Sequence, residues 1–221
     1  AQPPLYDMIM DIPPTLRELE HRHGIDFRKN FLNGDLARGG FAGSGVSQQN
    51  RLVERHEFEN GRGSYWISYD FKPRRARGDL VRFPLGPEFD GNPFNSLAFE
   101  HDGGEAIISL PNGLQYYALL KGNGDRLDEP APADVVYDDQ ATSGTPAIVN
   151  GLSCMNCHKN GMIDFRDEIR GAEAVGGLVL NKVRELYPPQ NEMDELVEND
   201  RQRFLAALEK AIGPFLQIAE D

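Results

Sequence analysis

The only two cysteines of the chain stand three positions apart, and a histidine follows the second, in the run Cys154-Met155-Asn156-Cys157-His158. A C-x-x-C-H run is the attachment pattern of c-type haem. On one turn of helix, two thiols at this spacing lie about as far apart as the two vinyl groups to which they add as thioethers. The imidazole of the next residue reaches the iron as its proximal ligand. The sequence therefore predicts one covalent haem c, held by Cys154 and Cys157 and ligated by His158.

Two other chemistries use a C-x-x-C pair. A thioredoxin-type redox pair belongs in a βαβ context at a helix N-terminus that stabilises the thiolate, but here a loop rich in glycine and proline (144–151) precedes it. A structural zinc site needs four nitrogen or sulfur ligands. The remaining histidines all lie far upstream: His21, His23, His56 and His101. The adjacent histidine therefore favours haem over both alternatives.

Composition indicates a soluble globular chain with an acidic surface. The 221 residues carry a formal net charge of −12, and no apolar run approaches the 18 residues of a membrane span. The negative charge argues against nucleic acid and anionic membranes as partners and suits a basic redox partner protein. General solubility explains the same charge without any partner.

The chain opens Ala1-Gln2-Pro3-Pro4, without the basic and apolar regions of a signal peptide. Bacteria attach haem covalently outside the cytoplasmic membrane. We therefore expect a periplasmic or otherwise exported protein, and we expect that this sequence is a mature form or an excised piece.

Hydrophobic periodicity predicts an α+β fold. Residues 1–145 are expected to form a helix and an antiparallel β-rich region, and residues 146–221 a helical part that carries the haem; together they form one cooperative unit. The expected strands alternate apolar and polar residues between turn signals: 52–58, 64–71, 81–83, 106–110, 114–120 and 135–137. The expected helices follow prolines or have apolar residues at helical spacing: 15–23, 165–186 and 191–212. We expect residues 1–12 to be extended and the glycine-rich segment 33–47 to be a loop.

The sequence resembles a family of exported bacterial mono-haem c-type cytochrome domains. The resemblance covers most of the chain from about residue 40, and it rests on several short stretches: 43–47, 65–71, 99–105, 109–115 and Asn150-Gly151-Leu152-Ser153 with the C-x-x-C-H run. It implies haem binding and electron transfer, and a cytochrome c-like C-terminal part. Small class I cytochromes carry a helix just before the motif, whereas a loop and a β-rich region precede it here. The first helix or the sheet must therefore cover the haem face.

The second axial ligand would decide what the haem does, because it sets the potential and the access to the iron. We favour His101, since it precedes Asp102-Gly103-Gly104 at the entry to the expected hairpin, where a turn can aim it inward. Asp102 or Glu100 would then accept the other ring N–H and fix the tautomer. An iron with no sixth ligand is the main alternative.

Other residues are weaker candidates for contact with the haem. Met193 has the downstream placement that class I cytochromes use, but it also begins the apolar face of the last helix, and Met162 follows His158 too closely to reach the opposite face with ease. The run of Arg74, Arg75 and Arg77 could pair with the haem propionates. Strand aromatics could pack on the porphyrin or belong to an ordinary core: Tyr65, Trp66 and Tyr69.

Three functions follow from these observations. The first is one-electron transfer by a mono-haem cytochrome. The second is a haem-based sensor or binding module for small ligands. The third is a peroxidase-like enzyme in which His101 acts as a distal base and an arginine polarises peroxide. A strong sixth ligand would favour transfer, and a weak or absent one would favour the other two.

Overall fold

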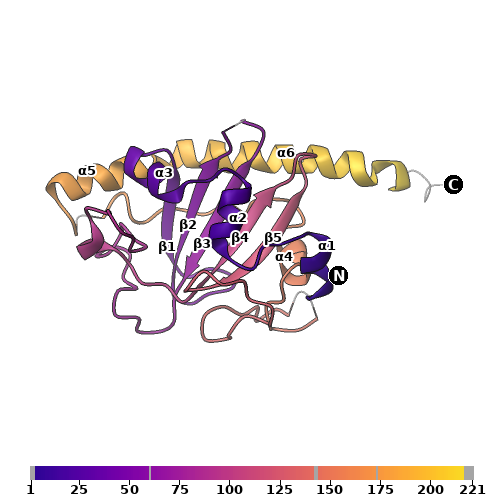
Figure 1. The fold of residues 1–221 in the computed structure, drawn as a ribbon, viewed down its shortest axis with the longest axis horizontal. Helices are drawn as coiled ribbons and strands as arrows, with labels where there is room; N and C mark the ends of the chain where they lie inside the picture. Colours follow the sequence, from indigo (N-terminus) through magenta and orange to yellow (C-terminus); the bar gives the residue numbers. More distant parts are fainter. Residues whose placement is uncertain (1–2, 60, 142–143, 173, 217–221) are drawn as a thin grey trace.

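The computed structural model describes residues 3–59, 61–141, 144–172 and 174–216. Five strands form one antiparallel sheet in which each strand pairs with the next along the chain (Figure 1). The strands are β1 (Ala37–Ala42), β2 (Asn50–Glu57), β3 (Ser64–Asp70), β4 (Gly103–Ser109) and β5 (Gln115–Lys121). This meander confirms the α+β class and the antiparallel arrangement.

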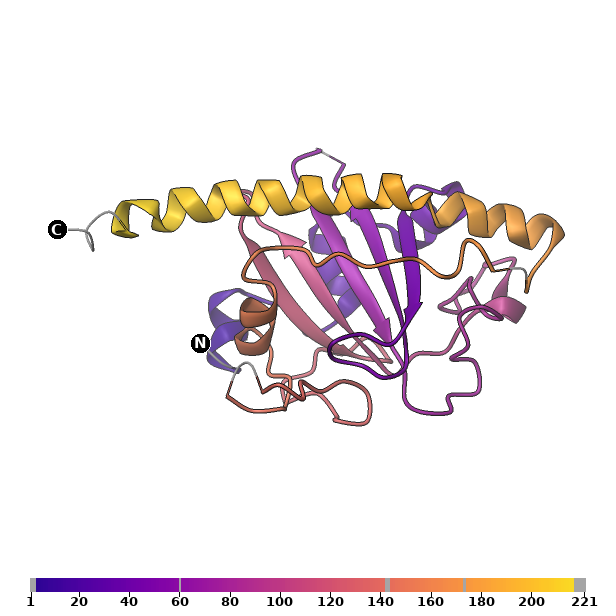
Figure 2. The same cartoon turned by 180° about the vertical axis from the view of Figure 1, so that it is seen from behind.

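One face of the sheet lies against the long helix α6 (Gln190–Leu216), which runs across the strands (Figure 2). Asp200 of this helix accepts hydrogen bonds from Arg55, Ser64 and Trp66, at 2.8, 2.7 and 2.8 Å. Neighbouring side chains of a strand point to opposite faces, so these bonds identify the face that α6 covers.

The opposite face packs against the helices near the N-terminus, α2 (Leu16–Arg22) and α3 (Phe27–Asn33) (Figure 1). The Tyr65 hydroxyl donates to Glu20 of α2, and His56 contacts Asn30 of α3 at 2.9 Å. The short helix α1 (Leu5–Ile9) lies beside α4 (Leu152–Cys157) at the β5 end of the sheet. The sheet is therefore the middle layer of the molecule.

The β1 edge is covered by the segment between α4 and α5 (Gly177–Leu186). The Gly40 N–H donates to Asp167 Oδ1 at 2.9 Å, and the Glu168 N–H donates to the Gly40 carbonyl at 2.8 Å. A Cβ atom on Gly40 would lie 2.6 Å from Ile169, and one on Gly39 would lie 2.4 Å from Phe165. These glycines allow the close approach that satisfies the polar groups of an edge strand.

Several expected elements are confirmed. They are the strand at 64–71, the hairpin from 106 to 120, the helix after Thr15 and the long final helix. The Thr15 hydroxyl caps α2 by accepting the Glu18 N–H at 3.2 Å, so the helix expected from residue 15 begins at Leu16.

Other expectations were wrong. The glycine-rich segment contains β1, the extended lead-in contains α1, and the helix expected at 165–186 begins only at Gly177. Residues 81–83 and 135–137 form turns and irregular chain instead of strands. The physical reason is packing between distant segments: 165–170 is drawn along the β1 edge, where its backbone bonds to the sheet. No helix within the described ranges is long and apolar enough to cross a membrane.

Candidate functional site

The C-x-x-C-H motif forms α4 and the residue that follows it. Gly151 precedes the helix with φ of +75°, and a Cβ atom there would lie 2.7 Å from the ring of Tyr6. At the helix start the Val149 N–H donates to the Ser153 hydroxyl at 2.9 Å. The Asn150 amide donates to Asp7 at 2.8 Å. The contacts of Asn150 and Gly151 with Asp7 and Tyr6 therefore hold the helix that carries the two thiols against α1.

Both cysteines reach the same cavity. Cys154 is buried, Cys157 is half-buried, and both line a hollow of about 730 Å³ between α4 and the sheet. Sites for small molecules and cofactors have volumes of about 300–1,000 Å³, so the hollow has the size of a cofactor site. Burial and then the nearby Glu105 carboxylate raise the pKa of the Cys154 thiol.

His158 is oriented with one ring nitrogen toward this cavity. Its Nδ1 lies 3.2 Å from the Gly161 carbonyl, so this nitrogen carries the proton and donates. Its Nε2 faces Glu105 Oε1 at 4.0 Å. The ring stacks on Tyr117, with centroids 5.9 Å apart and an angle of 29°. A histidine that ligates a metal is typically fixed in this way, through a hydrogen bond at its second nitrogen.

The loop after His158 is held by α6. The Arg201 guanidinium donates to the Met162 carbonyl twice, at 3.0 and 2.9 Å. Gly161 has φ of +85°, and a Cβ atom there would lie 3.3 Å from Arg201. The carbonyl that orients His158 thus sits in a turn that packs against the longest helix of the protein.

The sheet supplies the opposite wall of the cavity, which is mostly apolar with a polar cluster. The apolar lining includes Trp66, Ile107, Leu119, Val135, Ile148, Met162 and Phe165. The polar cluster consists of Arg51, Ser68, Asp70 and Glu105. Arg51 Nε lies 3.0 Å from Asp70, and its Nη2 donates to Ser68 at 3.0 Å and to Glu105 at 3.3 Å. Burial raises the pKa of Asp70, and Arg51 opposes that rise.

The structure does not bring His101 to this cavity. Its ring contacts Tyr69 and Phe99, with centroids 5.0 and 6.1 Å apart. The Tyr69 hydroxyl donates to Glu54 on one face of β3. Trp66 and Ser68, which line the cavity, point to the other face of this strand. Burial lowers the pKa of His101 to about 4.

The methionines are dispersed. Met162 lines the cavity and is buried. Met193 is buried in the core at the start of α6, outside the cavity lining. Met8 and Met155 are exposed, and Met10 is half-buried.

The arginine run expected to meet the propionates lies elsewhere. Arg75 pairs with Glu100 and Asp102 at 3.5 Å each, and Arg77 donates to the Asn95 carbonyl at 2.6 Å. Arg51 and Arg166 line the cavity instead, and Arg51, which bonds to Glu105 inside it, was not among the expected site residues. Glu105 offered a signal, because it is the single charged residue of its strand. Arg51 offered none, because its strand also carries Glu54, Arg55 and Glu57.

The remaining histidines are also away from the motif. His56 is fully buried on the other face of the sheet, where its Nε2 contacts Glu54 at 2.8 Å. His23 bonds to the Tyr116 hydroxyl at 2.5 Å, and His21 is exposed. Within the part of the chain that the structure describes, no group of three or more His, Cys, Asp or Glu side chains is placed to hold a metal ion.

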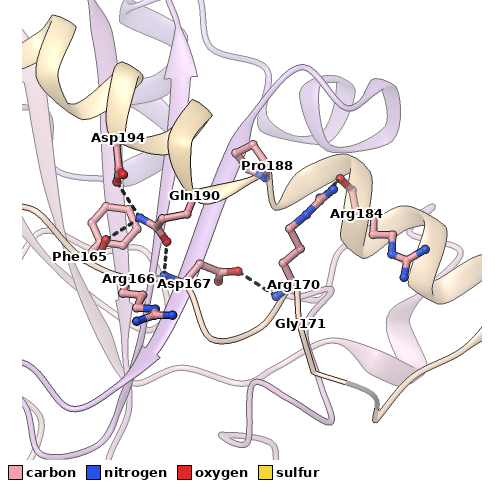
Figure 3. A pocket seen from close by; sticks show the side chains of 9 residues that line it. All are labelled: Phe165, Arg166, Asp167, Arg170, Gly171, Arg184, Pro188, Gln190 and Asp194. Carbon is pink, nitrogen blue, oxygen red and sulfur yellow. Dashed lines mark hydrogen bonds between the residues drawn. The ribbon is translucent and has the colours of Figure 1, made fainter.

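A second hollow, of about 830 Å³, lies between the segment after Met162 and the helices α5 and α6 (Figure 3). Its polar groups mostly bond to one another. The Gln190 amide donates to the Phe165 carbonyl at 2.9 Å and accepts the Asp167 N–H at 2.9 Å. Arg170 donates to the Arg184 carbonyl at 2.7 Å. These bonds fasten the segment to the two helices, and the C-x-x-C-H motif takes no part in this hollow.

Comparison with known proteins gave no match, whether with family models, with curated proteins or with solved structures.

Proposed function

We propose that this chain is a mono-haem c-type cytochrome domain that transfers one electron at a time in the periplasm. The observation that carries the proposal is the orientation of His158. Its Nδ1 is occupied by Gly161, and its Nε2 faces a cavity that both motif cysteines line. Sequence spacing alone predicts the three residues, and their convergence on one hollow of cofactor size supports that prediction.

Each of these residues has a definite task. Cys154 and Cys157 would hold the haem through thioethers, formed when their S–H groups add across its two vinyl groups, and His158 would ligate the iron. The bound haem supplies the reversible one-electron change of the iron. Tyr117 and the Gly161 carbonyl orient the imidazole, and the apolar lining excludes water. In such a cytochrome c-like domain, the segment from residue 146 onward would hold the haem, and the sheet would cover it.

The surface charge supports a basic redox partner. The net charge of −12 would attract a positively charged protein and speed its association, in a way that salt weakens. Covalent haem attachment supports an exported location, because bacteria carry it out beyond the cytoplasmic membrane.

A small-ligand sensor is the second candidate function, and one observation favours it. Arg51 and Glu105 place charged groups in the same cavity as His158, where an iron-bound ligand would meet them. The peroxidase-like alternative receives no support from His101, because that side chain packs against Tyr69 and Phe99.

A spectroelectrochemical titration of the protein, matured with the haem-attachment machinery, tests the proposed transfer. We expect the haem spectrum to follow the applied potential reversibly, with about 59 mV for each tenfold change in the ratio of oxidised to reduced protein. The variant His158→Gln should alter the spectrum and the potential, whereas His21→Gln, at an exposed position, should alter neither. A haem that cycles irreversibly, or that His158→Gln leaves unchanged, would contradict the proposal.

A further inference from the structure

We propose that Glu105 is the sixth ligand of the iron, so that its carboxylate and the His158 imidazole take the two axial positions. This inference rests on the proposed function and names the ligand that sequence reasoning had assigned to His101. It concerns a residue in the middle of β4, on the sheet wall that faces α4.

The distance between the two side chains is the first argument. Glu105 Oε1 and His158 Nε2 lie 4.0 Å apart, which is too long for a hydrogen bond. Bonds from a first-row metal such as zinc measure about 2.0–2.1 Å to imidazole nitrogen and about 2.0–2.2 Å to carboxylate oxygen. One ion held between the two atoms would therefore separate them by about 4.0–4.3 Å, which agrees with the observed gap.

The way in which Glu105 is held is the second argument. Its Oε2 accepts from Arg51 at 3.3 Å, and its backbone N–H donates to the Ser68 hydroxyl at 2.9 Å. Arg51 is in turn fixed by Asp70 at 3.0 Å. The second oxygen, Oε1, lies toward His158, and the carboxylate also lies close to the Cys154 thiol. Glu105 belongs to β4, an interior strand of the sheet, and ligands on rigid elements keep their geometry best.

The composition of the cavity lining is the third argument. Among the described residues that surround it, His158 is the only histidine and Met162 the only methionine. Met162 belongs to the turn that directly follows His158, and Arg201 holds its carbonyl. Glu105 comes from the facing sheet, which is the side that the free nitrogen of His158 faces.

Carboxylate ligation has a chemical consequence that can be measured. An anionic oxygen stabilises ferric iron more than ferrous iron, so the midpoint potential should be low compared with His/Met ligation, which raises it. A carboxylate is also a weak-field ligand, so the ferric haem should be high-spin and should lack the sulfur-to-iron charge-transfer band.

Ferric absorption, electron paramagnetic resonance and midpoint potential of the haem-loaded protein test the assignment. Glu105→Gln should raise the potential by about 59 mV or more, which corresponds to a tenfold or greater loss of preference for ferric iron. Glu105→His should convert the ferric haem to a low-spin state with two imidazoles. Glu100→Gln removes the same charge from an exposed side chain and should leave spin state and potential unchanged.

Two results would overturn the assignment while leaving the proposed function intact. A low-spin wild-type spectrum that Met162→Leu converts to high-spin would make Met162 the ligand. A potential and a spin state that neither Glu105 variant alters would exclude Glu105. Wild-type protein that holds no covalent haem would instead refute the proposed function and this inference together, so the two failures are distinguishable.

Discussion

The indole of Trp66 donates a hydrogen bond of 2.8 Å to the carboxylate of Asp200, a residue 134 positions later in the chain. The same carboxylate accepts from Arg55 and Ser64. Asp200 therefore joins α6 to the sheet that forms one wall of the candidate haem cavity. Burial would raise the pKa of Asp200, but Arg55, Ser64 and Trp66 outweigh it and hold the pKa below its usual value.

Asp200→Ala should destabilise the protein by about 3–5 kcal/mol, because it leaves the Arg55 guanidinium buried without its main partner. Urea unfolding at neutral pH measures the loss. Glu198→Ala, which removes an exposed carboxylate of the same helix that pairs with Arg201, should cost less than about 1 kcal/mol. Equal effects of the two substitutions would show that α6 is not anchored through Asp200.

Glu20 should make stability depend on pH. Burial, and then the charge of Glu54, raise the pKa of Glu20 to about 8 in the folded protein, above the value of about 4.3 in an unfolded chain. The folded state then holds a proton that the unfolded state releases. This contribution is complete below pH of about 4 and is lost as the pH rises through about 8.

Unfolding free energies at pH 5, 7 and 9 test whether stability falls as the pH rises. The contribution of Glu20 predicts falling stability across this range for the wild type, and a smaller fall for Glu20→Gln, which cannot titrate. The matched control is Glu18→Gln, at an exposed position of the same helix, which should follow the wild type. A Glu20→Gln variant with an unchanged pH profile would contradict the prediction.

Gly151→Ala should destabilise the packing of α4, the helix that carries Cys154 and Cys157, against α1. The residue has φ of +75°, and the new Cβ atom would lie 2.7 Å from the Tyr6 ring. Backbone strain of this kind costs of the order of 1–3 kcal/mol, and the displaced Tyr6 adds to it. We expect a lower melting temperature and a lower yield of haem-loaded protein. Gly171→Ala, where a Cβ atom meets nothing within 4 Å, should change neither; a Gly151→Ala protein with wild-type stability would refute the expected contact.

Local signals predicted much of the fold. The prolines before residue 15, the turn signal between the strands expected at 106–110 and 114–120, and the apolar face of the last helix act within a few residues. Each marks an element that the structure contains. The β1 strand could not be foreseen in the same way. Its glycines disfavour a strand locally, and the strand is stabilised by contacts with residues 165–169, more than 120 positions away.

In the candidate site too, contacts between neighbours in the chain could be predicted and contacts between distant segments could not. The spacing of Cys154, Cys157 and His158 predicts haem attachment without any tertiary information, because those residues are neighbours in the chain. The facing groups come from three strands, so Glu105 lies opposite His158, with Arg51 bonded to it, only after the sheet has formed. His101 was favoured for its place before a glycine turn, yet the alternation of side chains along β3 places its partner Tyr69 on the other face.

The mass of the intact protein, after maturation and under denaturing conditions, tests the central claim most directly. We predict that the wild type carries the added mass of one haem, which denaturation does not release, and that Cys154→Ser combined with Cys157→Ser abolishes it. Wild-type protein that has the mass of the bare polypeptide after expression with the haem-attachment machinery would contradict the account.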